Sequence, residues 1–401
     1  MSIRAGLMGA RTVLGAGLCG AGFWFSVLGA CFIAVPAEGA GLTSPEQLVK
    51  AYELILDARF PEAERVLKQA CPPAPLPACE VIGAVADYWR LLLDPEDASG
   101  DAALMRRIDA SINSGEAWVA REPGRAEAWF YLGGAYGTRV LLRGHREQYL
   151  AAARDGKRIH DALQHAIRLD PSLSDAYFGL GLYHYYAAIA PRAARILSAL
   201  LFLPGGDRAG GLREMEQTRT SGMLLRGEAD YQLHLIYLWY ERQPPTALRL
   251  VEGLRSRYAH NPVFYVRLAE AQGDYLRNHA DALKTSRALF DAARAGRVAS
   301  PAIAEVNARL GMAKAFDALC ETSNAIEQLR AVLAQKPASP YSAAARAYYQ
   351  LGVTFDGAGR RSDAIDAYRN AIASAASDDR LRIREKARAA IRKAPLPQRC
   401  R

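Results

Sequence analysis

The sequence contains none of the common short motifs of catalytic sites. HExxH, the phosphate-binding loop GxxxxGK(S/T) and the nucleophile motif GxSxG are absent from its 401 residues. No two of the seven histidines stand four residues apart, and no CxxC or other cysteine–histidine spacing typical of a metal site occurs. We therefore expect a non-catalytic protein with no metal site and no cofactor.

Net charge is nearly absent from most of the chain, although the formal net charge of the whole is +9. Residues 1–37 carry +2 and residues 380–401 carry +8, which leaves −1 for residues 38–379. The body is therefore close to neutral, and any electrostatic partner is expected at the C-terminal end.

The N-terminus has the pattern of an export signal. The segment of residues 1–11 is short and basic, and residues 12–37 contain no charge. Val35 and Ala37 have the spacing of a signal-peptidase site. The uncharged run is also long enough for an uncleaved membrane anchor, and Cys31 lies in a lipoprotein-like cleavage box. All three alternatives place the rest of the chain outside the cytosol, in the periplasm or cell envelope.

Two cysteines agree with export. Cys71 and Cys79 flank a short proline-rich segment, PPAPLPA. A disulfide between them would close a nine-residue loop in an oxidising compartment. The alternative is two unpaired thiols at helix ends.

The body of the chain carries an internal repeat. Residues 126–137 contain Trp-x-x-Leu-Gly-x-x-Tyr, the pattern returns with changes at 174–186, and residues 348–371 contain one nearly complete unit. Weaker copies begin near residues 51, 231 and 310. Small residues at these positions let two antiparallel helices approach closely, and each helix pair then buries its apolar face against the next pair.

On these motifs the chain resembles the tetratricopeptide-repeat superfamily over residues 45–376, with residues 79–122 divergent. The resemblance implies an all-α fold, a helical solenoid of stacked antiparallel helix pairs. Residues 377–394 are predicted to form a basic capping helix, followed by a tail at 395–401. Residues 177–241 are also similar to a eukaryotic tetratricopeptide family that includes a yeast inclusion-body-clearance protein.

The resemblance further implies that a protein or peptide partner binds along a concave face formed by the first helix of each pair. Positions counted from the matched glycines place Arg346 and a set of largely aromatic residues on that face. We predict these as the partner-binding groove: Phe130, Phe178, Tyr185, Tyr186, Gln232, Trp239, Tyr240 and Tyr349. Tyrosine and tryptophan are typical of binding hot spots, but the same aromatics could instead pack between repeats.

The C-terminal segment is amphipathic and strongly basic. Its apolar residues fall on one predicted helical face and its basic residues surround that face, as expected of a cap that contacts solvent or an anionic membrane. The basic residues are Arg382, Arg384, Lys386, Arg388 and Arg392. A nucleic-acid partner is not expected for an exported protein.

The sequence thus predicts an exported scaffold that binds a protein or peptide in the cell envelope. The alternative is a periplasmic accessory protein that binds a small molecule or lipid inside the superhelix. A closed apolar cavity would favour the alternative, and an open groove would favour the scaffold.

Overall fold

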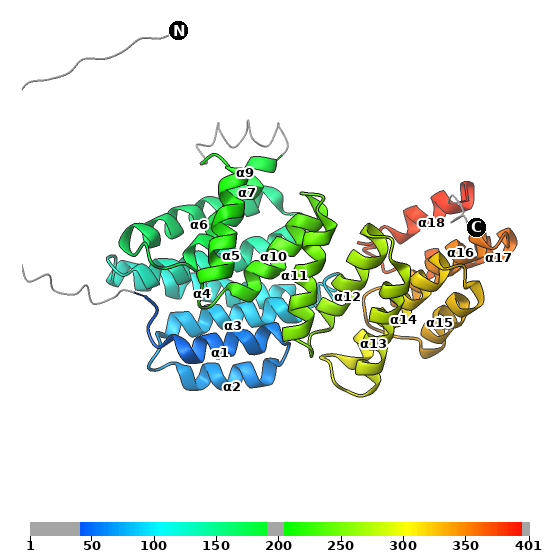
Figure 1. The fold of residues 1–401 in the computed structure, drawn as a ribbon, viewed down its shortest axis with the longest axis horizontal. Helices are drawn as coiled ribbons and strands as arrows, with labels where there is room; N and C mark the ends of the chain where they lie inside the picture. The colour runs from blue at the N-terminus through cyan, green and yellow to red at the C-terminus, as the bar shows by residue number, and fades with distance from the viewer. Residues whose placement is uncertain (1–40, 191–203, 395–401) are drawn as a thin grey trace, which may run out of the picture. The chain divides into compact units, whose positions relative to one another are not determined.

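The computed structural model describes residues 41–190 and 204–394. Within these ranges every regular element is a helix (Figure 1), which confirms the all-α prediction. No helix in the same ranges is long and apolar enough to cross a membrane. The predicted export signal at residues 1–37 and the tail at 395–401 lie outside the described residues.

Within each of the two described ranges the helices follow one another with short connections. Numbered as in Figure 1, they are α1 (Pro45–Leu56), α2 (Phe60–Ala70), α3 (Leu76–Leu91), α4 (Asp101–Arg121), α5 (Ala126–His145), α6 (Tyr149–Leu169), α7 (Ala176–Ile189), α9 (Arg208–Ser221), α10 (Arg226–Trp239), α11 (Pro244–Arg257), α12 (Pro262–Glu270), the π-helical turn η1 (Ala271–Tyr275), α13 (His279–Arg294), α14 (Pro301–Ala318), α15 (Thr322–Gln335), α16 (Ala343–Gly357), α17 (Arg361–Ser374) and α18 (Ile383–Arg392).

The helices pack as pairs of consecutive elements, from α1–α2 to α16–α17. The first helices of neighbouring pairs also contact one another. For example, α3 contacts α5, and α14 contacts both α12 and α16. The first helices therefore form a continuous inner layer. This arrangement is the tetratricopeptide-type solenoid that the repeats predicted.

The repeat glycines lie where two helices meet closely. A Cβ atom on Gly133 would come within 2.6 Å of the Leu163 side chain, and one on Gly181 within 2.7 Å of the Gly211 carbonyl oxygen. Contacts this short show that no side chain fits between the helices at these points. The glycines predicted from the pattern thus serve close helix packing.

Substituting Gly181 by alanine is expected to lower the free energy of unfolding by about 2–3 kcal/mol. The new methyl group would meet the Gly211 carbonyl oxygen of α9, which is backbone, and the buried Met215 side chain. Gly253→Ala in α11 is the matched control, because nothing lies within 4 Å of its added Cβ. That control should gain up to about 1 kcal/mol from helix propensity. Urea denaturation measures both, and equal effects would contradict the packing role.

The first helices close on one another across a long stretch of sequence. Glu228 in α10 accepts hydrogen bonds from Trp89 Nε1 in α3 (3.0 Å) and from the Tyr52 hydroxyl in α1 (3.3 Å). The Trp89 ring also lies against Tyr231 and Phe264, with centroid distances of 4.9 and 5.7 Å. A simple solenoid has contacts only between neighbouring units, so this closure departs from the sequence prediction.

Two further contacts reinforce the closure between the start and middle of the chain. His260 Nδ1 lies 2.7 Å from Asp57 Oδ2, and the His260 backbone N–H donates to the same carboxylate. Asn261 donates from Nδ2 to the Leu56 carbonyl oxygen at 2.7 Å. The loop between α1 and α2 is therefore fixed to the loop between α11 and α12.

A second long-range contact joins the α3–α4 loop to the C-terminal pairs. The Tyr341 backbone N–H donates to both carboxylate oxygens of Asp94, at 3.0 and 2.8 Å. Arg380 Nη1 donates to the Glu96 carbonyl oxygen at 3.2 Å. The α3–α4 loop therefore lies beside the first helix of the last pair, α16.

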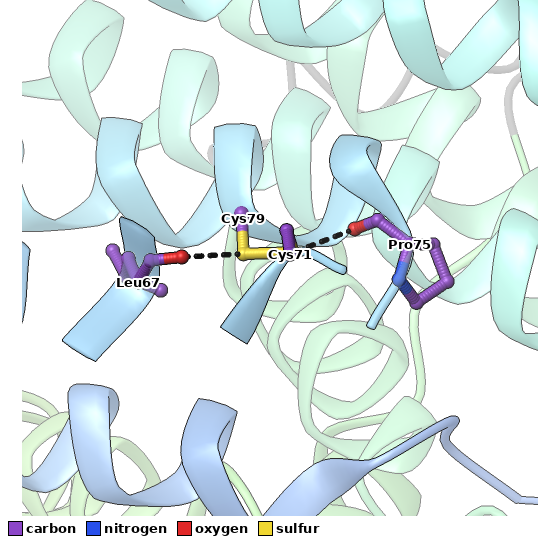
Figure 2. The surroundings of a disulfide bond; sticks show 4 residues. All are labelled: Leu67, Cys71, Pro75 and Cys79. Atoms are coloured by element: carbon purple, nitrogen blue, oxygen red, sulfur yellow. Dashed lines mark hydrogen bonds between the residues drawn. A yellow bond between two sulfur atoms is a disulfide. The ribbon is translucent and has the colours of Figure 1, made fainter. Parts of the chain in front are cut away.

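The two predicted disulfide cysteines link the end of α2 to the start of α3 (Figure 2). Their sulfur atoms are 2.07 Å apart, the distance of a disulfide bond. Cys79 Sγ lies 3.3 Å from the Leu67 carbonyl oxygen, and Cys71 Sγ lies 3.1 Å from that of Pro75. Because α3 begins at Leu76, Cys79 stands in its first turn rather than in a loop.

Candidate partner-binding groove

Half of the predicted groove residues are buried in the core. Phe130, Phe178, Tyr185 and Gln232 are each less than 9% exposed. Tyr185 donates its hydroxyl to Glu241, and Gln232 donates to Glu228. The prediction that these four face an open groove is corrected, because they pack between neighbouring helices, as Phe178 and Tyr185 do with residues of α9, α10 and α11.

The other four predicted groove residues reach solvent. Tyr186, Trp239 and Tyr240 are 38%, 41% and 47% exposed. Tyr349 is half-buried, with its ring centroid 5.8 Å from that of Tyr368 in α17. The first three come from the carboxyl ends of α7 and α10.

The structure contains a groove elsewhere on the inner layer, between α12, η1, α13, α14 and α16, with a volume of about 360 Å³. We call it the C-terminal groove. Residues of three successive first helices line it: Val266, Ala269 and Glu270 from α12, Asn307, Gly311 and Lys314 from α14, and Arg346 and Gln350 from α16. Ala269, Gly311, Gly273 and Ala318 leave this space open because their side chains are small.

Most charges in the C-terminal groove are already paired. Lys314 Nζ lies 2.7 Å from Asp274 Oδ2, which joins α14 to η1. Glu270 pairs with Arg267 at 2.7 Å within α12. These pairs hold the walls of the groove and leave little net charge there.

Two arginines that line the groove are exceptions, the exposed Arg277 and the enclosed Arg346. The nearest acceptor of Arg346 is Asn307 Oδ1, 3.3 Å from Nη1, and Arg346 forms no ion pair with any carboxylate in the described part of the chain. Burial lowers the pKa of Arg346, and the negative charges of Asp94 and Glu96 oppose that shift. A guanidinium carries five N–H donors, so Arg346 has spare donors at an enclosed position in the groove.

The basic C-terminal helix is shorter than predicted. The cap begins as helix α18 at Ile383, where Asp379 accepts the backbone N–H groups of Ile383 and Arg384. Ile383, Ala387 and Ala390 are buried against the neighbouring pair.

Two arginines cap helix ends across the α17–α18 contact. Arg384 donates to the carbonyl oxygens of Ala375 and Ala376, just past the end of α17. Arg361 at the start of α17 donates to the carbonyls of Ala390 and Ile391 in the last turn of α18. Arg384 therefore serves helix capping rather than a free basic surface. Of the predicted basic residues, Arg382, Lys386, Arg388 and Arg392 remain exposed, and Arg382 pairs with Glu385.

No group of three or more histidine, cysteine, aspartate or glutamate side chains in residues 41–190 and 204–394 could hold a metal ion. Two of the described histidines instead contact a single carboxylate each. His184 Nδ1 lies 2.7 Å from Glu214 Oε2 on the neighbouring helix α9, as His260 Nδ1 does from Asp57 Oδ2.

Comparison with known proteins finds similarity to solved helical-repeat structures. No family model and no curated protein matches the sequence. A structure of NprR in complex with its cognate peptide NprX has 10% identity and a TM-score of 0.38, and the match covers 86% of this chain and 81% of that one. The human IFIT1 dimer with m7Gppp-AAAA has 16% identity and a TM-score of 0.43, over 84% and 68% of the two chains. Yeast Tom70 has 12% identity and a TM-score of 0.39, over 87% and 83%.

Proposed function

We propose that this chain is a non-catalytic scaffold that binds an extended segment of a partner protein in the C-terminal groove. The observation that carries the proposal is Arg346, an enclosed cation with unused donors in a groove lined by three successive first helices. A partner's carbonyl or carboxylate group would supply the acceptors that the chain itself does not.

The shape and chemistry of the groove support a polypeptide ligand. Charged and amide side chains alternate with small apolar ones along the walls. An extended backbone needs polar partners for its N–H and C=O groups and space for alternate side chains. Asn307 and Gln350 offer amide groups, while Ala269 and Gly311 leave room.

Filling the groove is expected to weaken peptide binding at least tenfold. A random 12-residue peptide library displayed on phage is selected on the full chain, and the best peptide is synthesised for fluorescence anisotropy. Ala269→Trp occupies the groove, and Arg346→Ala removes the unpaired donors. Each should lower the affinity by about 1.4 kcal/mol or more.

The matched control is Arg330→Ala, an exposed arginine on α15 outside the groove. It should bind the selected peptide like the unchanged chain. If Ala269→Trp and Arg346→Ala also bind it normally, the groove is not the binding site and the proposal fails.

A second candidate is binding of a small molecule, because about 360 Å³ lies within the usual range of ligand sites. The paired charges along the walls favour a polar ligand over a lipid. Native mass spectrometry of the purified chain tests this candidate: a retained small molecule that Ala269→Trp expels would support it.

We further propose that the protein acts outside the cytosol, in the cell envelope. The basic and then uncharged N-terminal sequence and the closeness of the Cys71 and Cys79 sulfurs support this. Lys386, Arg388 and Arg392 on α18 would then offer a basic surface to anionic lipid. The mass of the mature chain discriminates the alternatives, and we expect cleavage after Ala37. A full-length cytosolic product would contradict export.

A further inference from the structure

Three exposed aromatic side chains form a surface that the proposed groove does not include. We call Tyr186, Trp239 and Tyr240 the aromatic shelf. The rings of Tyr186 and Tyr240 meet edge to face, with centroids 5.7 Å apart and planes at 83°. Trp239, which is also exposed, is the chain neighbour of Tyr240. Exposed large aromatics at neighbouring positions are typical of a binding surface.

Tyr186 is the least exposed of the three side chains, at 38%. Its ring also meets that of the buried Tyr185 edge to face, with centroids 5.5 Å apart, and burial raises its pKa.

The shelf is continuous with the C-terminal groove through α12. The Arg267 guanidinium lies over the Trp239 ring, 5.4 Å from its centroid, and also pairs with Glu270 at 2.7 Å. Glu270 and its neighbour Val266 line the groove. A polypeptide that leaves the groove at α12 therefore reaches the shelf directly.

The charges beside the shelf are already paired. Arg267 pairs with Glu270, although its buried Nε has no hydrogen-bond partner in the described part of the chain. Glu241 accepts from both Arg208 and the Tyr185 hydroxyl. The shelf thus offers ring surface without an unpaired charge, which suits an apolar group.

We infer that the aromatic shelf is a second subsite for the same partner, and that it binds an aromatic or large aliphatic side chain. The inference rests on the proposed function, because the occupant is the segment that fills the C-terminal groove.

A double-mutant cycle on the selected 12-residue peptide tests the subsite. Each aromatic or large aliphatic residue of the peptide is replaced by alanine, and binding is measured to the unchanged chain and to Tyr186→Ala/Tyr240→Ala. One peptide residue should lose on the order of tenfold in affinity on the unchanged chain. The same replacement should lose less than about twofold on the double variant, because the partner surface is gone.

Matched controls separate the subsite from the fold and from the groove. Tyr149→Ala removes an exposed tyrosine on α6 and should leave the peptide scan unchanged. Tyr186→Phe/Tyr240→Phe keeps the rings and should restore binding if the rings act by apolar contact. Circular dichroism confirms that each variant is folded.

The outcomes distinguish the two proposals. If Ala269→Trp weakens binding but Tyr186→Ala/Tyr240→Ala changes neither the affinity nor the scan, the shelf is overturned and the groove stands. If the selected peptide is insensitive to Ala269→Trp as well, both are overturned. Coupling between one apolar peptide residue and the shelf supports the inference.

Discussion

Replacing Glu228 by alanine is expected to lower the free energy of unfolding by about 3–5 kcal/mol, a large share of a typical domain's stability. The Trp89 indole N–H and the Tyr52 hydroxyl both donate to this carboxylate inside the core. Alanine would leave both donors buried without acceptors and would add a cavity. Urea denaturation followed by tryptophan fluorescence measures the loss.

Glu228→Gln separates the hydrogen bonds from the charge. Burial raises the pKa of Glu228, and the hydrogen bonds from Trp89, Gln232 and Tyr52 oppose that shift. Because the pKa is raised in the folded state, protonation of Glu228 stabilises the fold. This contribution to the free energy of unfolding is complete at pH values below the ordinary glutamate pKa, and it is lost as the pH rises through the pKa of the folded state.

The glutamine variant keeps an acceptor and carries no charge. Its stability relative to the unchanged chain should therefore rise with pH, and at neutral pH it should be at least as stable. A glutamine variant as unstable as the alanine variant at neutral pH would show that the ionised carboxylate itself holds the closure.

A second substitution, Asp155→Ala, is expected on its own to lower the free energy of unfolding by about 3–5 kcal/mol. The Asp155 side chain is 2% exposed and forms a two-pronged pair with Arg139 at 2.9 and 2.8 Å, while Arg143 contacts the same carboxylate. Without Asp155, the Arg139 guanidinium between α5 and α6 would keep only Asp109 as a partner. A buried charge that loses its partner is strongly destabilising.

Asp161→Ala on the same helix provides the control. Asp161 is 52% exposed and pairs with Lys157 one turn away, so its loss should cost less than about 0.5 kcal/mol. Chemical denaturation of both variants gives the difference. Similar values for the two would mean that Asp155 is not a structural residue of the α5–α6 pair.

The sequence predicts the helix pairs and their close contacts well, because both depend on local spacing. Glycines at 133 and 181 and the apolar positions around them lie within a few turns of one another, so periodicity reveals them. The closure is different. Its residues, Tyr52, Trp89 and Glu228, lie far apart along the chain. No local pattern distinguishes any of them from an ordinary residue of an amphipathic helix.

The sequence prediction also misplaced part of the binding site, because the site depends on contacts between helices that are far apart in the sequence. Counting from repeat glycines gives which side of a first helix faces inward, but not whether another helix covers that side. Packing between neighbouring helices buries Phe130 and Tyr185, whereas Arg346 lines a groove between the later pairs. Small residues at 269, 273, 311 and 318 on successive first helices were the signal in the sequence that could have located it.

The contact between α1 and the α10–α12 region has a consequence for synthesis of the chain. A nearest-neighbour array can fold unit by unit as it leaves the ribosome. Here α1 and the loop after it have Glu228 and His260 as partners, and the ribosome synthesises these residues well over a hundred positions later. During that interval α1 and α3 expose apolar surface, so a chaperone that holds nascent chains would meet this protein early.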